Sequence, residues 1–163
     1  MSVEVRPARR DDVDGLCRVA ERAWHVAHAP IIGGDAVESF LNEHYDAESF
    51  RALVAADAVV LRAALGSDGV VGFVSARPRE GGATFDLGRI YVHPDRWGEG
   101  IGGRLLDRAE TAVRERGGDR IELGVMAEND RAVAFYESAG YDRVGEFYDD
   151  RIDADGYTYA NEL

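Results

Sequence analysis

The sequence predicts a mixed α/β fold in which antiparallel strands precede a central parallel pair. The first observation is a turn at Ser67-Asp68-Gly69 between two apolar runs, which is the pattern of an antiparallel hairpin. The second is an amphipathic helical pattern between two strand-like runs, at 84–92 and 120–126. Two strands joined by one helix in this way are parallel, with a right-handed crossover.

The first half of the chain is expected to open with a strand and to continue with helices before the hairpin. Asp11 or Asp12 can cap the first helix, and Pro30 with Gly33 and Gly34 is expected to interrupt it. The expected elements are a strand at 3–6, a first helix that runs to about residue 27, helices at 35–45 and 47–55, and hairpin strands at 59–65 and 70–76.

The second half is expected to alternate strands and helices. Gly117 and Gly118 end one helical pattern and Gly140 closes another, as glycine often does after a helix. One domain over residues 1–163 is expected, since this length suits a single core. The expected elements are a third antiparallel strand at 84–92, a helix at 101–116, a strand at 120–126, a helix at 129–139 and two strands around 153–156.

The surface is predicted to be strongly acidic. The chain has 31 acidic and 19 basic residues, a net charge of −12, and no lysine. Such a surface repels nucleic acid and anionic lipid, so neither is expected as a partner. Two interpretations of the charge remain open. One is adaptation to a salt-rich cytoplasm that screens the repulsion, and the other is an acidic mesophilic protein from a GC-rich genome.

A cytoplasmic location is expected. No apolar run reaches the length of a membrane span, and no charged start leads into an apolar signal segment. The one cysteine, Cys17, cannot form an internal disulfide, and four scattered histidines do not form a metal site, so no metal is expected. The sequence leaves open whether the protein forms a homodimer.

Four glycines fall within six residues in the stretch that follows the strand ending at Val92. They are Gly98, Gly100, Gly102 and Gly103, and a helical pattern begins among them. The first turn of a helix presents backbone N–H groups that carry partial positive charge. A glycine-rich turn of this kind binds phosphate without a basic side chain.

Two other phosphate-binding motifs fit this stretch less well. A Walker-type loop is excluded, because no Gly-Lys-Ser/Thr follows. The dinucleotide fingerprint is matched by Gly98, Gly100 and Gly103, and Glu122 lies near the position of its acidic residue. However, five residues separate the strand from Gly98, whereas that fingerprint needs a tight turn directly after the strand.

Three segments together resemble the GNAT superfamily of N-acetyltransferases: 90–95, the glycine loop, and Asn129 with the run Phe135-Tyr136…Gly140-Tyr141. The resemblance implies a GNAT-like mixed sheet, with helices around it and a central parallel strand pair that splays apart to admit acetyl-CoA. The family's loop pattern begins with Gln or Arg, where this chain has Trp97. Arg96 or Arg104 is expected to compensate near the phosphates.

The resemblance implies that acetyl-CoA is the acetyl donor. The pyrophosphate would lie on the loop backbone and the pantetheine arm beside the strand, with Asn129 in contact with the arm. The implied cofactor-binding residues are Ile90, Tyr91, Val92, Gly98, Glu99, Gly100, Ile101, Gly102, Gly103 and Asn129.

The implied reaction is direct attack of an amine on the acetyl group. Tyr136 is the expected general acid for the leaving thiolate, since a phenol holds its proton at neutral pH. A glutamate frequent in the family would fall at Gly124, so that base is absent. A second family position, six residues before Val92, is occupied by Asp86, and the resemblance implies that Asp86 is the base. Burial in its apolar strand would raise the pKa of Asp86, although a solvated strand edge is the alternative. Glu122 is the reserve candidate.

The acceptor pocket is expected between the first two helices and the final hairpin. No catalytic role is assigned to its aromatic candidates, because most such residues pack or lie at the surface. They are Trp24, His25, His28, Tyr45 and Tyr148. A catalytically silent acyl-CoA-binding module is the alternative to an enzyme.

Overall fold

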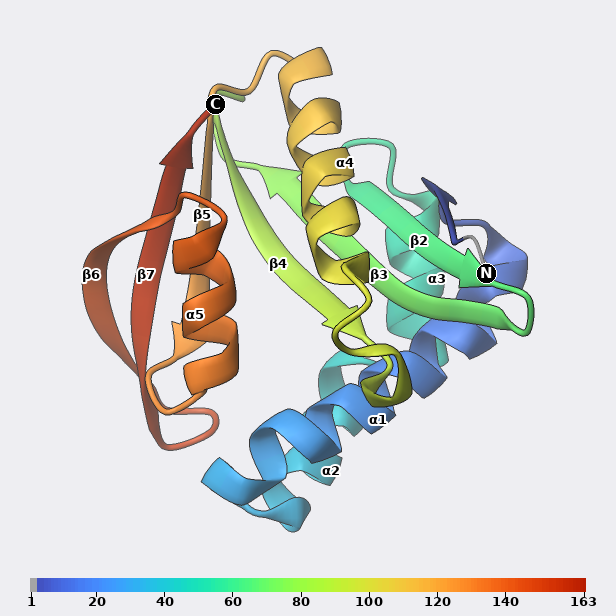
Figure 1. Cartoon of the computed structure of the whole chain (residues 1–163), viewed down its shortest axis with the longest axis vertical. Coiled ribbons are helices and arrows are strands. Elements are labelled where there is room, and N and C mark those ends of the chain that lie inside the picture. The colour runs from blue at the N-terminus through green and yellow to red at the C-terminus, as the bar shows by residue number, and fades with distance from the viewer. Residues whose placement is uncertain (1–2) are drawn as a thin grey trace.

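The structure, a computed structural model, describes residues 3–163, which form five α-helices around one seven-stranded sheet (Figure 1). The strand order is β1-β2-β3-β4-β5-β7-β6. The strands are β1 (Glu4–Pro7), β2 (Val60–Gly66), β3 (Gly69–Pro78), β4 (Thr84–Val92), β5 (Arg120–Met126), β6 (Asp142–Asp149) and β7 (Ala154–Glu162). The helices are α1 (Val13–Ile32), α2 (Gly34–His44), α3 (Ala47–Ala55), α4 (Ile101–Glu115) and α5 (Asp130–Ser138).

The mixed α/β class and the central parallel pair are confirmed. Strands β4 and β5 pair in parallel across α4, and every other neighbouring pair in the described sheet is antiparallel. This is the splayed GNAT-like arrangement that the sequence predicts.

Each face of the sheet has its own core. Helices α4 and α5 cover one face, and α1, α2 and α3 cover the other (Figure 1). Side chains of β2 alternate between the two cores, because Val60 packs under α4 while its neighbour Leu61 packs with α1 and α3. The two cores hold the central strands rigidly from both sides.

The first helix is longer than expected, because α1 continues through Pro30 to Ile32. A proline removes one backbone hydrogen bond, here to the carbonyl of Val26. Ile31 and Ile32 pack against the core of that face, which offsets the loss. The helix ends at Gly33, whose φ of 91° a residue with a side chain rarely adopts.

Strands β4 and β5 separate soon after they meet. Only Thr84, Phe85 and Asp86 of β4 have partners on β5. The register with β3 then shifts so that Gly88 is the extra residue, a bulge that increases the local twist. Figure 1 shows the two strands diverging from there, which leaves 87–92 as an open strand edge inside the sheet.

No helix within residues 3–163 combines the length and the apolar character needed to cross a membrane.

Candidate active site

The glycine loop adopts backbone conformations that require glycine. Gly98 and Gly100 have φ values of 85° and 80°. Gly100 caps α4 in a left-handed conformation, and the amide of Arg104 is the first to bond back, to the carbonyl of Gly100 at 3.2 Å. The preceding amides of the first turn therefore have no partner within the helix, as at any helix start. Unpaired amides of this kind are the donors that the predicted anion binding requires.

A cavity of about 390 Å³, which we call the loop cleft, lies between this loop, β4 and α5. Of the ten predicted cofactor-binding residues, only Glu99 does not line it, because its carboxylate turns away to Arg96 at 3.0 Å. The loop cleft is lined by Ala23, Ala27, Ile90, Tyr91, Val92, Arg96, Trp97, Gly98, Gly100, Ile101, Gly102, Gly103, Asn129, Arg131, Ala132, Phe135 and Tyr136.

Trp97 is fixed at the mouth of the loop cleft by two contacts. Its indole N–H donates to the carbonyl of Val92 at 2.8 Å, and the guanidinium of Arg131 lies 4.1 Å from its ring centre. Of the two arginines expected there, Arg96 lines the loop cleft and is paired with Glu99 at 3.0 Å, whereas Arg104 is exposed and does not line it. Sequence reasoning missed Arg131, which also lines the cleft.

A second cavity of about 440 Å³, which we call the fork pocket, opens where β4 and β5 separate. It combines aromatic residues of α1 and α2 with carboxylates and arginines of the strands and the final hairpin. The two cavities meet, because both are lined by Ile90, Tyr91, Asn129, Ala132 and Tyr136.

Tyr136 lies where the two cavities meet. It is 7% exposed, and burial raises the pKa of its phenol above the usual range. Tyr136 is therefore protonated at every pH at which the protein would work. Asn129 caps the same helix, because its side-chain oxygen accepts from the amide of Ala132 at 3.2 Å.

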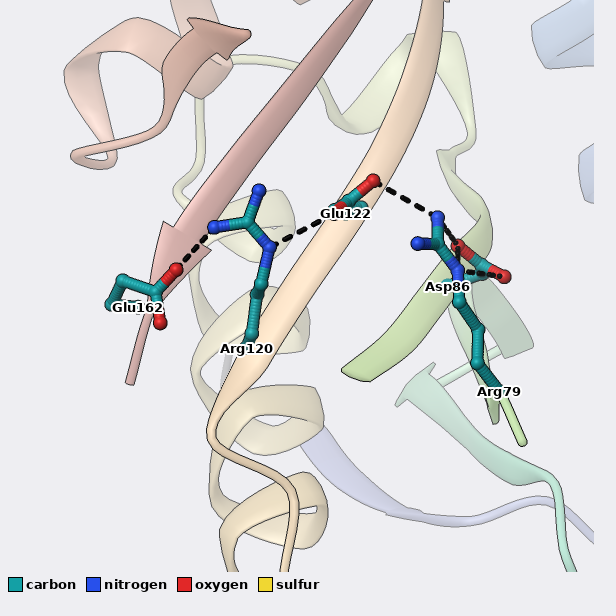
Figure 2. Close-up of polar contacts among 5 residues, drawn as sticks. All are labelled: Arg79, Asp86, Arg120, Glu122 and Glu162. Atoms are coloured by element: carbon teal, nitrogen blue, oxygen red, sulfur yellow. Dashed lines mark hydrogen bonds and ion pairs between the residues drawn. The ribbon is translucent and has the colours of Figure 1, made fainter. Parts of the chain in front are cut away.

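A chain of alternating charges crosses the sheet at the fork (Figure 2). Arg79 donates to both carboxylate oxygens of Asp86, at 2.6–3.0 Å, and to Glu122 at 2.9 Å. Arg120 donates to Glu122 at 2.9 Å and also to Glu162. Asp86 and Glu122 are the last paired residues of β4 and β5, so Arg79 bridges the strands at the point where they separate.

The expected burial of Asp86 is wrong, because its side chain is 44% exposed at the sheet opening. Its carboxylate is held by Arg79 and is reached by solvent, so it matches the solvated alternative. Glu122 is less exposed, at 18%, and is bound by two arginines. Hydrogen bonds from Arg120 and Arg79 hold the pKa of Glu122 below its usual range.

The helical side of the fork pocket is aromatic. The ring of His28 lies 4.3 Å from that of Trp24 and at right angles to the ring of Tyr91. His28 is 5% exposed, and burial lowers its pKa to about 4, so it is neutral at pH 7. Its Nδ1 atom has no hydrogen-bond partner within residues 3–163.

Of the five aromatic pocket candidates, Trp24, His28 and Tyr45 line the fork pocket. His25 instead pairs with Glu38 at 2.5 Å, and Tyr148 is exposed and bonded to Asp153.

Sequence reasoning also missed Phe147, which lines the fork pocket from β6. Its ring lies over two glycines on neighbouring strands. A Cβ atom at Gly156 would lie 2.3 Å from this ring, and one at Gly124 would lie 3.1 Å from it. Glycines within strands are the signal that could have indicated this close approach.

Comparisons with known proteins agree with this architecture. The sequence model described as the acetyltransferase (GNAT) family matches residues 23–141. The spermidine N(1)-acetyltransferase of Thermoplasma acidophilum is 26% identical over 145 residues, which cover 86% of this chain and 89% of that protein.

Solved structures share the fold. The PaiA N-acetyltransferase from Thermoplasma acidophilum, crystallised with coenzyme A, superimposes with a TM-score of 0.90 at 22% identity, and each chain is covered completely. The aminoglycoside 6'-acetyltransferase type Ii has a TM-score of 0.71 at 25% identity, over 98% of this chain and 96% of that one.

The family model spans most of the chain, and the glycine loop and the strand fork lie within it. This chain therefore belongs to the GNAT family of acetyltransferases. It is an acyltransferase, so these comparisons favour an enzyme over the alternative of a catalytically silent module.

Proposed function

We propose that this protein transfers an acetyl group from acetyl-CoA to a primary amine by direct attack within a ternary complex. The observation that carries the proposal is the meeting of the two cavities at Tyr136. A donor in the loop cleft and an acceptor in the fork pocket would bring their reacting atoms together beside this protonated phenol. The one cysteine, Cys17, lines neither cavity, so no covalent acetyl-enzyme is needed.

The loop cleft supports the donor half of the proposal. Amides at the start of α4 suit a pyrophosphate, and the open edge of β4 at 87–92 can pair with the amides of a pantetheine arm. The crystallised PaiA relative holds coenzyme A. A β4 amide near Tyr91 or Val92 would also polarise the thioester carbonyl.

Arg131 is expected to contribute to donor affinity through the phosphates. Its guanidinium stacks on Trp97 and carries the positive charge that the loop side chains lack. Replacement by alanine (Arg131→Ala) should raise the Kd for coenzyme A by about tenfold, equivalent to about 1.4 kcal/mol. Isothermal titration calorimetry measures this.

Two controls accompany that measurement. Pantetheine carries no pyrophosphate, so its affinity should be the same for the wild type and for Arg131→Ala. The matched variant Arg104→Ala removes an exposed arginine of α4 outside the loop cleft, and its Kd for coenzyme A should stay at the wild-type value. An equal loss for pantetheine and coenzyme A would contradict a phosphate contact.

The fork supports the acceptor half of the proposal. The neutral amine nitrogen bonds to the thioester carbon, and the carbon–sulfur bond breaks. Tyr136 donates its proton to the departing sulfur. The nitrogen releases its surplus proton through water to Asp86, which is the better placed of the two carboxylates because it is more exposed and is bound by one arginine only.

The rate is expected to rise with pH. Free alkylamines titrate near pH 10, so only a small fraction of the acceptor is in the neutral form that attacks at pH 7. The value of kcat/KM should therefore increase by nearly tenfold per pH unit between about pH 7 and pH 9. No falling limb should appear in that range, because burial raises the pKa of Tyr136. A flat pH profile would mean that a base in the site deprotonates the bound ammonium group.

The decisive test is release of free thiol from acetyl-CoA in the presence of different amine classes. The relative from Thermoplasma acidophilum is named as a spermidine acetyltransferase, so di- and polyamines belong in the first panel beside amino acids, aminoglycosides and peptides. Amine-dependent thiol release with a matching N-acetyl product supports the proposal, and no release with any amine contradicts it.

A further inference from the structure

Phe147 lies over two glycines of the fork pocket, an unusual position that we call its seat. This residue comes from the edge strand β6, and its ring extends across Gly156 of β7 towards Gly124 of β5. The register places Phe147 directly opposite Gly156. A side chain at Gly156 would collide with the ring, and one at Gly124 would press tightly against it, so the two glycines form the surface on which the ring rests. The ring itself is 39% exposed and lines the pocket.

Carboxylates flank this ring on two sides. Glu122 lies two residues before Gly124 on β5, and side chains two residues apart on a strand project from the same face. Asp149 lies two residues after Phe147 on β6 and lines the same pocket, where it is paired with Arg151 at 2.8 Å. Asp155, next to Gly156, also lines the pocket.

The charge around the ring is negative. Four carboxylates line the fork pocket, those of Asp86, Glu122, Asp149 and Asp155, against the three guanidinium groups of Arg79, Arg89 and Arg151. One negative charge is left over at the fork. An exposed aromatic face beside net negative charge attracts a cation, because the ring quadrupole and the carboxylates act in the same direction.

This seat cannot hold the nitrogen that reacts. The attacking nitrogen must be neutral and must lie where the two cavities meet, whereas Phe147 lines the fork pocket and not the loop cleft. We propose that Phe147, on its two-glycine seat, binds a second, non-reacting ammonium group of the acceptor. The acceptor class is then a linear diamine or polyamine, and Phe147 determines specificity for it. The inference rests on the proposed acetyl transfer to amines.

The test compares two acceptors of equal length, 1,4-diaminobutane and 4-amino-1-butanol, of which only the first has a second ammonium group. Phe147→Leu keeps an apolar side chain but removes the ring. It should raise KM for the diamine by about tenfold, the size of a desolvated cation–π contact, and leave KM for the amino alcohol and for acetyl-CoA within twofold. Phe147→Tyr keeps the aromatic face and should restore selectivity.

A second variant addresses the seat. Gly156→Ala keeps the ring but places a methyl group where the ring lies, so it should show the same selective loss for the diamine. Val144→Ala, another exposed apolar residue of β6, is the matched control and should behave as the wild type. Equal KM changes for both acceptors in Phe147→Leu would overturn the inference and leave acetyl transfer intact. No thiol release by the wild type with either acceptor, or with any other amine, would instead contradict the proposed function.

Discussion

Replacement of Tyr136 by phenylalanine is expected to lower kcat by about 100-fold with no change in coenzyme A affinity. General acids contribute about 10² to 10⁴ in rate, and a thiolate, which is a fairly stable leaving group, places the effect at the lower end. Tyr136 is buried where the two cavities meet, and burial keeps its phenol protonated. Phenylalanine keeps the ring packing and removes only the proton donor.

Stopped-flow or steady-state thiol release gives kcat, and calorimetry with coenzyme A gives the affinity. Tyr157→Phe is the matched control, because it removes the hydroxyl of a half-buried tyrosine that lines neither cavity. Unchanged turnover in Tyr136→Phe would show that solvent, or another group, protonates the sulfur. A loss of coenzyme A affinity equal to the loss in rate would indicate a role in binding.

Stability is expected to fall by about 2 kcal/mol between pH 7 and pH 5 through His28 alone. Burial lowers the pKa of His28 from 6.5 to about 4. Above pH 6.5 the ring is neutral in both the folded and the unfolded chain. Below pH 6.5, the unfolded chain binds a proton on His28, whereas the folded chain does not bind it until about pH 4. Stability is therefore lost across this window, by about 1.4 kcal/mol per pH unit, and levels off below it.

Urea unfolding at pH 7 and at pH 5 measures this loss. His28→Phe and His28→Gln both remove the titrating group, so each should lose about 2 kcal/mol less than the wild type over the same interval, whatever its stability at pH 7. His25→Gln, which removes a half-buried imidazole from the same helix, is the matched control. If both His28 variants kept the full loss, His28 would not be its source, and the folded protein would have to accept a proton on His28 as readily as the unfolded chain does.

The glycine loop was predictable because it is one contiguous segment, whereas α1, β4 and α5 supply the rest of the loop cleft. Positive φ at Gly98 and Gly100, and a helix that starts at Ile101, follow from local glycine preferences and helix-end chemistry. Trp97 looked like a defect in the pattern, yet its stacking on Arg131 depends on α5, which is more than 30 residues away in sequence. No local pattern contains that contact.

The fork pocket was predictable only in part, because it depends on strand register. Asp86 was expected to be buried from its apolar neighbours, but it lies in the last paired position before the strands separate, where solvent enters. The positions of Arg79 and Phe147 likewise depend on pairing between distant segments. Glycines inside β5 and β7 were visible in the sequence, but the side chain that covers them was not.

The opening between β4 and β5 also concerns how the fold is held together. Three paired residues at one end join a four-stranded half, β1 to β4, to a three-stranded half, β5 to β7, and α4 connects them. A bound pantetheine arm would act as an eighth strand that completes the unfinished sheet. Donor concentration would then contribute to the free energy of unfolding, by about 2.7 kcal/mol at 100 times Kd. The gap that we propose for the donor would then also make the donor part of the folded structure.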